Sequence, residues 1–300
     1  MRDIFLSLLL STFLLHGVEQ EPVEIAIEVS HGIPFVSLQI NDAHYLLILD
    51  SGAEKSRLSE EILACHSLVE TGNTITLVNV YGTLSASQIY VADQISVGNF
   101  ALEKCEFAAD FTDKNRLDSN SLPELRRGLI GRECFRDKAL AVDRRRRKCL
   151  VAAHSDQLIS HYQNEVEEWI KLSFTLEDGV TLKLKDQGVV KRFLVDTGCN
   201  YSLIHDDAVE LQLLTTRLES IAFPIEIDSG EFLGEHSFLK ANLSPIGFDG
   251  IIGFDFFDRF LVIFDFTTNE LFLAQIAHKA LEKFGASVSP NIPIYFLGKI

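Results

Sequence analysis

Two aspartates, Asp50 and Asp196, stand in the same local pattern: an apolar run, the Asp, a hydroxyl residue and a glycine. If the two carboxyl groups met about 3 Å apart they could not both ionise, so they would share one proton. The neutral carboxyl could then donate to a carbonyl oxygen while the charged one takes a proton from water. This is direct attack of water on an amide, and it needs neither a metal ion nor a covalent intermediate.

The residues that follow each aspartate would shape the turn that presents it. Glycine permits a positive φ and a close approach of another backbone. A hydroxyl group can bond across to the opposing copy and hold two such turns together. The residues expected in the active-site turns are Ser51, Gly52, Thr197 and Gly198.

The two aspartate motifs belong to a longer internal repeat. They lie 196 − 50 = 146 residues apart, and in each a Ser follows the Gly by four positions. The segments 128–152 and 250–274 match without a gap at an offset of 250 − 128 = 122. Each segment begins with Gly, two apolar residues and Gly, which could form a strand beneath the aspartate turn. The chain is therefore interpreted as two copies of one unit.

The repeat divides the chain into a first lobe at 20–153 and a second lobe at 168–300, with a polar linker at 154–167. Short β-branched and alternating segments dominate both lobes and predict strands. Helical patterns are confined to 59–70, 205–214, the linker and 275–285. The expected fold class is all-β with a few short helices, as two similar barrel-like lobes with the site between them.

Composition and charge exclude several classes of function. The chain has 27 Lys and Arg against 43 Asp and Glu, and its formal charge of −16 argues against a nucleic-acid or anionic membrane partner. Five Cys without a CxxC pair and nine His without an HExxH motif predict no metal site and no cofactor. Whether Cys134 and Cys149 pair stays open. The basic run at 144–148 is interpreted as a solvated hairpin turn.

The first residues form a candidate export signal. Arg2 precedes an apolar run at 4–15 that is too short to span a bilayer comfortably, and Gly17 supplies a small residue. We expect a cleaved signal peptide at 1–17 and an exported protein, periplasmic or secreted. The alternatives are an uncleaved membrane anchor and a buried first element.

With these motifs the sequence resembles the aspartic peptidases. The resemblance rests on LILDSGA and FLVDTGC, each followed at a suitable distance by two apolar residues and Gly, and it covers nearly the whole chain after the apolar run. It implies a bilobal acid-protease fold in one chain, closer to a fused pair of retropepsin-like units than to a full-length pepsin. By motif, Asp50 and Asp196 match the catalytic aspartates.

The resemblance also implies a flap. The stretch 80–83 is similar to the hairpin that closes over substrate in pepsin-like enzymes, which would place Tyr81 and Gly82 over the site. Tyr81 follows Asp50 by only 31 residues, a shorter spacing than a pepsin would have. The only Trp, Trp169, lies outside the first lobe, so the Trp partner of a pepsin flap Tyr is missing. Glu54 after Ala53 instead fits the retroviral pattern.

The expected function is an aspartic endopeptidase that acts on a peptide or protein substrate, as a monomer with both lobes in one chain. One alternative is a catalytically silent peptide-binding or scaffold protein with the same fold. Another is a peptidase that needs a second chain, against which the two internal copies argue. A third Asp-Ser-Gly triplet, at 228–230, follows an alternating segment and is interpreted as a hairpin turn.

Overall fold

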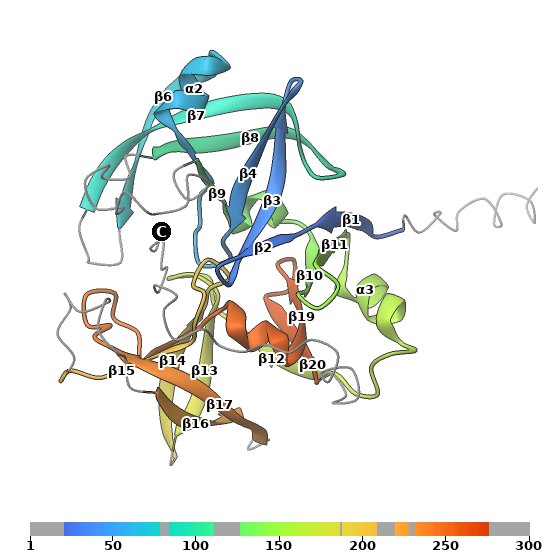
Figure 1. Cartoon of the computed structure of the whole chain (residues 1–300), viewed down its shortest axis with the longest axis vertical. Helices are drawn as coiled ribbons and strands as arrows, with labels where there is room; N and C mark the ends of the chain where they lie inside the picture. Colours follow the sequence, from blue (N-terminus) through green and yellow to red (C-terminus); the bar gives the residue numbers. More distant parts are fainter. Residues whose placement is uncertain are drawn as a thin grey trace, which may run out of the picture.

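The computed structural model describes residues 21–78, 84–110, 127–186, 188–208, 220–227 and 232–275. The expected signal peptide at 1–17 and the flap residues Tyr81 and Gly82 lie outside these ranges, as do the triplet at 228–230 and nearly all of the helical pattern at 275–285. The described chain is mostly strand with two α-helices, which confirms the all-β fold class (Figure 1). No described helix is long and apolar enough to cross a membrane.

The first lobe is built on an eight-stranded sheet with the order β2-β3-β4-β9-β5-β8-β7-β6, and β3 also pairs with β7 so that the sheet curls on itself. Its strands are β2 (Glu28–Ser30), β3 (Ile33–Ile40), β4 (Ala43–Leu49), β5 (Arg57–Ser59), β6 (Val69–Val78), β7 (Leu84–Val97), β8 (Phe100–Asp110) and β9 (Gly128–Ile130). Helix α2 (Glu60–Cys65) begins at the N-cap Ser59 and buries Ile62 and Leu63. It is shorter than the pattern at 59–70 predicted, because Ser67 takes a positive φ of 49° and β6 follows.

The second lobe is a closed barrel with the order β13-β14-β18-β15-β17-β16. Its strands are β13 (Thr181–Asp186), β14 (Val189–Val195), β15 (Leu203–His205), β16 (Ser220–Ile227), β17 (Phe232–Ala241) and β18 (Gly250–Ile252). Strands β16 and β17 pair antiparallel, so they flank the triplet at 228–230 as the two arms of a hairpin. The triplet itself lies outside the described residues, so the hairpin turn expected there stays a prediction.

The two lobes repeat the same strand pairing. Strand β4 runs parallel to β9 with Leu49 opposite Ile130, and β14 runs parallel to β18 with Val195 opposite Ile252. These partners are separated by 195 − 49 = 146 and 252 − 130 = 122 residues, the two offsets found in the sequence. The register therefore confirms the internal repeat.

A third sheet joins the two halves of the chain, with the order β1-β11-β10-β19-β20-β12 (Figure 1). Its strands are β1 (Val23–Ala26), β10 (Ala139–Asp143), β11 (Lys148–Ala152), β12 (Ile170–Ser173), β19 (Phe260–Asp265) and β20 (Glu270–Gln275). At its centre Ala141 lies opposite Ile263, and these two are repeat partners because 263 − 141 = 122. The pseudo-two-fold axis that relates the lobes therefore passes through this pair.

Each face of the joining sheet packs against a different part of the chain. Helix α3 (Ser155–Tyr162), within the linker that the sequence predicted, covers one face with Leu158 and Tyr162, and Trp169 packs beside them. Residues of the opposite face, among them Leu140 and Phe264, line a small cavity together with the aspartate turns of the site. This face of the joining sheet thus lies directly beneath the two aspartate turns.

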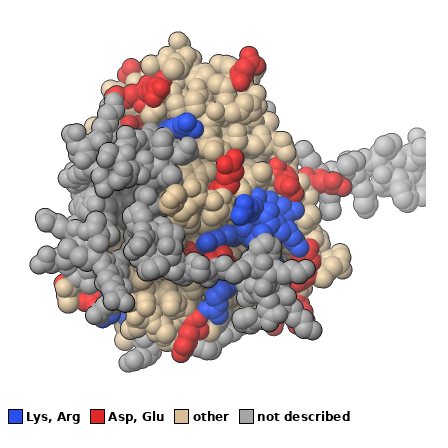
Figure 2. Space-filling view, viewed as in Figure 1, with Lys and Arg blue, Asp and Glu red and all other residues tan. Residues whose placement is uncertain are grey.

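The basic run at 144–148 forms the turn between β10 and β11, as predicted. Figure 2 shows Lys and Arg side chains gathered on one side of the molecule and bordered by acidic ones. The prediction that this turn is simply solvated is wrong for Arg144, which is 17% exposed. Its Nε lies 2.9 Å from Oδ1 of Asp258, and its guanidinium lies 4.7 Å from the ring centre of Phe254. A first-half arginine therefore binds the second half.

Strands β8 and β17 lack the β-branched alternation that predicts strands. Charged and polar residues such as Lys104, Glu106 and His236 interrupt their apolar pattern. Both segments are held as strands by backbone hydrogen bonds to a neighbour on each side. Strand β8 lies between β5 and β7, and β17 lies between β15 and β16. Tertiary pairing rather than local periodicity makes these segments strands.

Gly128 opens β9 with a φ of 129°, and a Cβ there would lie 2.0 Å from the carbonyl oxygen of Arg57. Gly128→Ala should therefore lower the free energy of unfolding by at least about 3 kcal/mol. Gly72→Ala is the matched control, because Gly72 has a positive φ of 77° but nothing within 4 Å of the added Cβ. It should cost about 1–2 kcal/mol. Urea unfolding of both variants measures the difference, and equal losses would contradict the steric argument.

Candidate active site

Strands β4 and β14 deliver Asp50 and Asp196 to the junction of the two lobes. The backbone N–H of Asp50 donates to the carbonyl of Ile130, and that of Asp196 donates to the carbonyl of Ile252, both at 2.9 Å. Strands β9 and β18 thus lie beneath the aspartates, where the repeated Gly-apolar-apolar-Gly segments predicted a strand. Each aspartate is only 1% exposed.

Gly52 and Gly198 permit the two carboxyl groups to meet. A Cβ on Gly52 would lie 2.7 Å from Cγ of Asp196, and a Cβ on Gly198 would lie 2.8 Å from Cγ of Asp50. Each glycine therefore packs directly against the carboxyl group of the opposite lobe, and any side chain would push the two lobes apart. The need for glycine here is a close approach and not a positive φ.

Ser51 and Thr197 bind the two turns to each other. The N–H of Ser51 donates to Oγ1 of Thr197 at 2.9 Å, and the N–H of Thr197 donates to Oγ of Ser51 at 3.1 Å. Each hydroxyl then donates to a strand of the opposite lobe: Ser51 to the carbonyl of Val195 at 3.0 Å, and Thr197 to the carbonyl of Leu49 at 2.6 Å. The four bonds are fully buried and related by the pseudo-two-fold axis.

One carboxyl oxygen of each aspartate accepts a hydrogen bond from the backbone of its own turn. Oδ1 of Asp50 accepts from the N–H of Ala53 at 2.9 Å, and Oδ1 of Asp196 accepts from the N–H of Gly198 at 2.8 Å. Burial raises the pKa of Asp50, and burial together with the negative charge of Asp50 raises that of Asp196 well above its usual value. The pair therefore holds a proton to a higher pH than an isolated Asp would.

Two serines support the turns from below. Oγ of Ser56 accepts from the N–H of Gly131 at 2.9 Å, and Oγ of Ser202 accepts from the N–H of Gly253 at 3.0 Å. These are the serines that the repeat places four residues after each Gly. In each lobe an acidic residue stands two positions after this glycine, Gly131 or Gly253, and also binds the serine.

The supporting acids are Glu133 in the first lobe and Asp255 in the second. The N–H of Ser56 donates to Oε1 of Glu133 at 2.5 Å, and Oγ of Ser202 donates to Oδ1 of Asp255 at 2.7 Å. Neither acid was predicted from the sequence. The signal that could have found them is the acid that follows Gly by two positions in each copy, in Gly-Arg-Glu and Gly-Phe-Asp.

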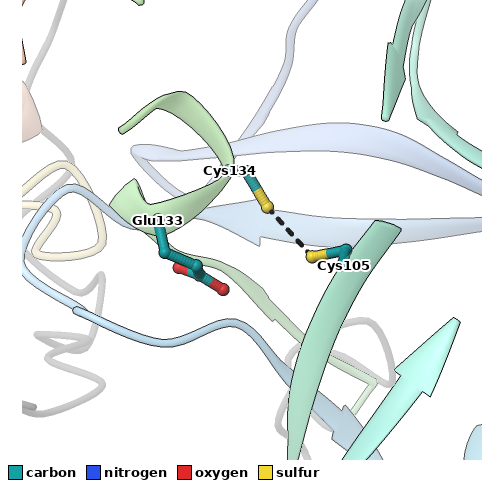
Figure 3. A group of neighbouring side chains, drawn as sticks. All are labelled: Cys105, Glu133 and Cys134. Carbon is teal, nitrogen blue, oxygen red and sulfur yellow. Dashed lines mark hydrogen bonds between the residues drawn. The ribbon is translucent and has the colours of Figure 1, made fainter. Parts of the chain in front are cut away.

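The third group of each support differs between the lobes. In the first lobe the Sγ atoms of Cys105 and Cys134 lie 3.4 Å apart beside Glu133 (Figure 3). In the second lobe, Nε2 of His236 lies 3.0 Å from Oγ of Ser202. The imidazole ring packs edge-on against the ring of Phe256. All five cysteines are free thiols, and the neighbour of Cys134 is Cys105, not Cys149.

Cys105, Glu133 and Cys134 are the group of possible metal ligands that the described residues bring together, with ligand atoms within 4.8 Å of one another. The hydrogen bond to Cys105 and burial raise the pKa of Cys134, so this thiol keeps the proton that a metal ion would have to displace. Oε1 of Glu133 already accepts from Ser56. These groups act as a support for the turn, and the absence of a metal site stays a prediction.

Arg132 links the first-lobe turn to the second lobe. Its Nη1 donates to the carbonyl of Gly52 and its Nη2 to that of Leu176, both at 3.4 Å. Its Nη2 also lies 3.8 Å from Oε2 of Glu54, the acid that the sequence noted after Ala53. The arginine itself was missed. Cys199, which follows Gly198 in the second turn, is fully buried, and its thiol donates to the carbonyl of Tyr201 at 3.0 Å.

Comparison with known proteins agrees with this geometry. Residues 36–134, which hold the first aspartate turn and β9, match the sequence profile of the aspartyl protease family. An aspartic proteinase from Irpex lacteus matches with a TM-score of 0.57 at 14% identity, over 85% of this chain and 98% of that chain. The profile match in the first lobe and the structural likeness together support an aspartic peptidase of the pepsin and retropepsin superfamily. Comparison with curated proteins gave no match.

The likeness to the Irpex lacteus proteinase extends to both halves of the chain, so the chain has the bilobal aspartic-proteinase fold. At 14% identity that likeness shows the fold alone. What the site can do chemically therefore has to be argued from its own residues.

Removing one of the crossing hydroxyls should weaken the contact between the lobes. Thr197→Val keeps the shape of the side chain but leaves the N–H of Ser51 without its acceptor, so it should cost about 2–4 kcal/mol. Ser51→Ala should cost a similar amount, and the double variant should cost clearly less than the sum, because the two side chains share bonds. Urea unfolding of the wild type, the two single variants and the double variant measures this coupling. Thr76→Val, at an exposed threonine of β6, is the control, and strict additivity would contradict the link.

Glu133 should make stability depend on pH. Burial raises the pKa of its carboxyl from 4.5 to about 7, although the N–H of Ser56 acts in the opposite direction. The folded chain thus keeps this proton to a higher pH than the unfolded chain does. The free energy of unfolding should therefore fall as the pH rises from about 4.5 to about 7 and change little above that range. The fall is at most roughly 3 kcal/mol.

Denaturant unfolding between about pH 4 and pH 8 measures this dependence. Glu133→Gln should remove most of the fall, since an amide cannot ionise, while the aspartate pair still contributes in the same direction. Glu28→Gln, at an exposed position of β2, should leave the dependence unchanged. A folded Glu133→Gln variant that keeps the full dependence would assign the effect to other groups.

Proposed function

We propose that this protein is an aspartic endopeptidase in which Asp50 and Asp196 together activate a water molecule for attack on a peptide bond. The observation that carries the proposal is the pair of buried carboxyl groups, each packed against the glycine of the opposite turn. Their raised pKa values favour a state with one shared proton, which is the state that the reaction needs.

The hydrogen bonds of the turns support a division of labour within each carboxyl group. Oδ1 of both aspartates is fixed by a backbone N–H of its own turn, and Oδ2 of Asp50 has no hydrogen-bond partner among the described residues. A free carboxylate oxygen can take a proton from water, while the protonated group donates to the substrate carbonyl. The proton gained from water can then pass to the leaving amine. Which aspartate is protonated at rest is a property of the pair.

The rest of the proposal follows from the sequence. Both aspartate motifs lie in one chain, so a single copy would suffice and the working form would be a monomer without a metal ion or cofactor. Tyr81 and Gly82 would cover the bound peptide. The apolar run at 4–15 supports export, by a cleaved signal or as an anchor. The pair must hold one proton, so activity should be highest below neutral pH.

Cleavage of a mixed peptide library by the full chain, followed by mass spectrometry between about pH 3 and pH 8, tests the proposal. Asp50→Asn and Asp196→Asn should each lower cleavage by about 1,000-fold or more, because neither carboxyl works alone. Asp228→Asn, in the third Asp-Ser-Gly triplet, is the matched control and should leave cleavage unchanged.

Two outcomes would count against the proposal. Cleavage that survives either single substitution would point to another catalytic pair or to a contaminant. A folded wild-type chain that binds peptides but cleaves none at any pH would favour the rival function, a catalytically silent peptide-binding or scaffold protein.

A further inference from the structure

Arg57 is a buried cation without a partner among the described residues. Its side chain lies on β5, an internal strand between β9 and β8, and the residue is only 7% exposed. Nε and Nη2 are sealed from solvent, and no described residue accepts a hydrogen bond from them. A buried charge normally has an ion pair or hydrogen bonds, because leaving it unpaired costs several kcal/mol. The simplest explanation for such a group is that a bound ligand supplies the missing hydrogen-bond acceptor.

The pleat of the sheet puts Arg57 on the side that carries the active-site turn. Its neighbour Leu58 points into the main core of the lobe, so Arg57 points to the opposite face. On that face its cross-strand partners are Leu129 and Ala108. Leu129 belongs to a small apolar cluster with Ala53, the residue that follows Gly52 in the turn.

Arg57 lies between two structures that a bound peptide would touch. On one side is the cluster of Leu129 and Ala53 at the aspartate turn. On the other is the cluster of Ala108 with Leu77 and Ile89, at the hairpin of β6 and β7 that leads to the expected flap at 80–83. Arg57 is also close enough to Asp50 to favour the charged form of that carboxyl. These apolar neighbours provide no acceptor for the guanidinium.

The second lobe shows what this position contains when it serves packing alone. The repeat partner of Arg57 is Leu203, because 203 − 57 = 146, and Leu203 lies opposite Ile251 as Arg57 lies opposite Leu129. Leu203 is 2% exposed within an apolar cluster that contains Cys199 and Ile251. The fold therefore accepts leucine at this site, and the arginine of the first lobe is not required by the architecture.

We infer that Arg57 binds a carboxylate of the substrate, so that this peptidase selects chains with an acidic group close to the scissile bond. The inference rests on the proposed endopeptidase function and adds its substrate class. Nε–H and one N–H of Nη2 lie on the same edge of a guanidinium, and that edge matches the two oxygens of a carboxylate. The two unpaired nitrogens are thus the pair that bidentate binding uses.

The selectivity has a pH limit. Side-chain carboxyl groups of unbound peptides titrate near pH 4, so a substrate Asp or Glu carries its charge above about that pH and loses it below. Selection for an acidic residue should accordingly weaken as the pH falls below about 4, even where the aspartate pair remains active. An uncharged substrate would show no such loss.

The test begins with the sites that the wild-type full chain cleaves in a peptide library. Matched peptides with Glu or Gln at the enriched position then give kcat/KM for each. In a second pair the only carboxylate is the C-terminus, which one peptide keeps free and the other carries as an amide; this pair separates a side-chain carboxylate from a terminal one. We expect the wild type to prefer the carboxylate peptide at least about tenfold at pH 5–6.

The variants assign that preference to one side chain. Arg57→Leu places the residue of the second lobe here and should abolish the preference. Arg57→Lys keeps the positive charge but not the two parallel N–H groups of the guanidinium, so it should retain part of the preference. Arg136→Leu, at an exposed arginine of the same lobe, should leave it unchanged. Thermal unfolding checks that each variant is folded.

The outcomes separate this inference from the proposed function. Wild-type cleavage without any preference for a carboxylate would overturn the role of Arg57 and leave the endopeptidase intact. Retention of the full preference in Arg57→Leu would also overturn it. If folded wild type cleaves no peptide at all, the proposed function fails and this inference fails with it. The comparison of Glu and Gln peptides by the wild type can overturn the inference even if one Arg57 variant does not fold, and Arg57→Lys and Arg57→Leu are two independent routes to assigning the preference.

Discussion

The reciprocal bonds between Ser51 and Thr197 are the constraint on which the rest of the structure depends. Each hydroxyl accepts from the opposite turn and donates to the opposite strand, so neither lobe can present its aspartate without the other. Buried hydrogen bonds of this kind are costly to leave unmade, which gives the contact a single geometry. The glycines then set how closely the turns approach. Burial raises the pKa of both carboxyl groups, and the nearby charge of Asp50 raises that of Asp196 further.

Beneath this contact lies a layer of polar groups that most apolar cores avoid. In each lobe a serine and an acid hold the glycine that follows β9 or β18. They are Ser56 and Glu133 in the first lobe and Ser202 and Asp255 in the second. The lobes share this plan but complete it differently, with two thiols in the first and a histidine among aromatic rings in the second. The symmetry is therefore close in the crossing bonds of Ser51 and Thr197, and it is weaker in the polar groups beneath them.

Fusion of two units into one chain is what permits that relaxation. In a homodimer every substitution appears twice, whereas here each lobe can change alone. Arg57 and Leu203 occupy equivalent positions with opposite chemistry, and Arg144 binds Asp258 where a symmetric chain would repeat the contact. The joining sheet, with three strands from each half, keeps the lobes in register while their surfaces diverge.

The sequence by itself determined the aspartate turns, the repeat and the mainly β class, because these depend on short-range patterns: triplets, apolar runs and alternation. Even the role of the hydroxyls followed from residue type. Only tertiary structure decided the roles of the acids Glu133 and Asp255 and of the arginines Arg132 and Arg57. The same holds for strands β8 and β17. Each of these depends on a partner far along the chain, as when Glu133 meets Ser56 across 77 residues. Burial of a charged side chain, in particular, has no local signature: the sequence contains Arg57 beside many exposed arginines, and only the fold removes it from water without a partner among the described residues.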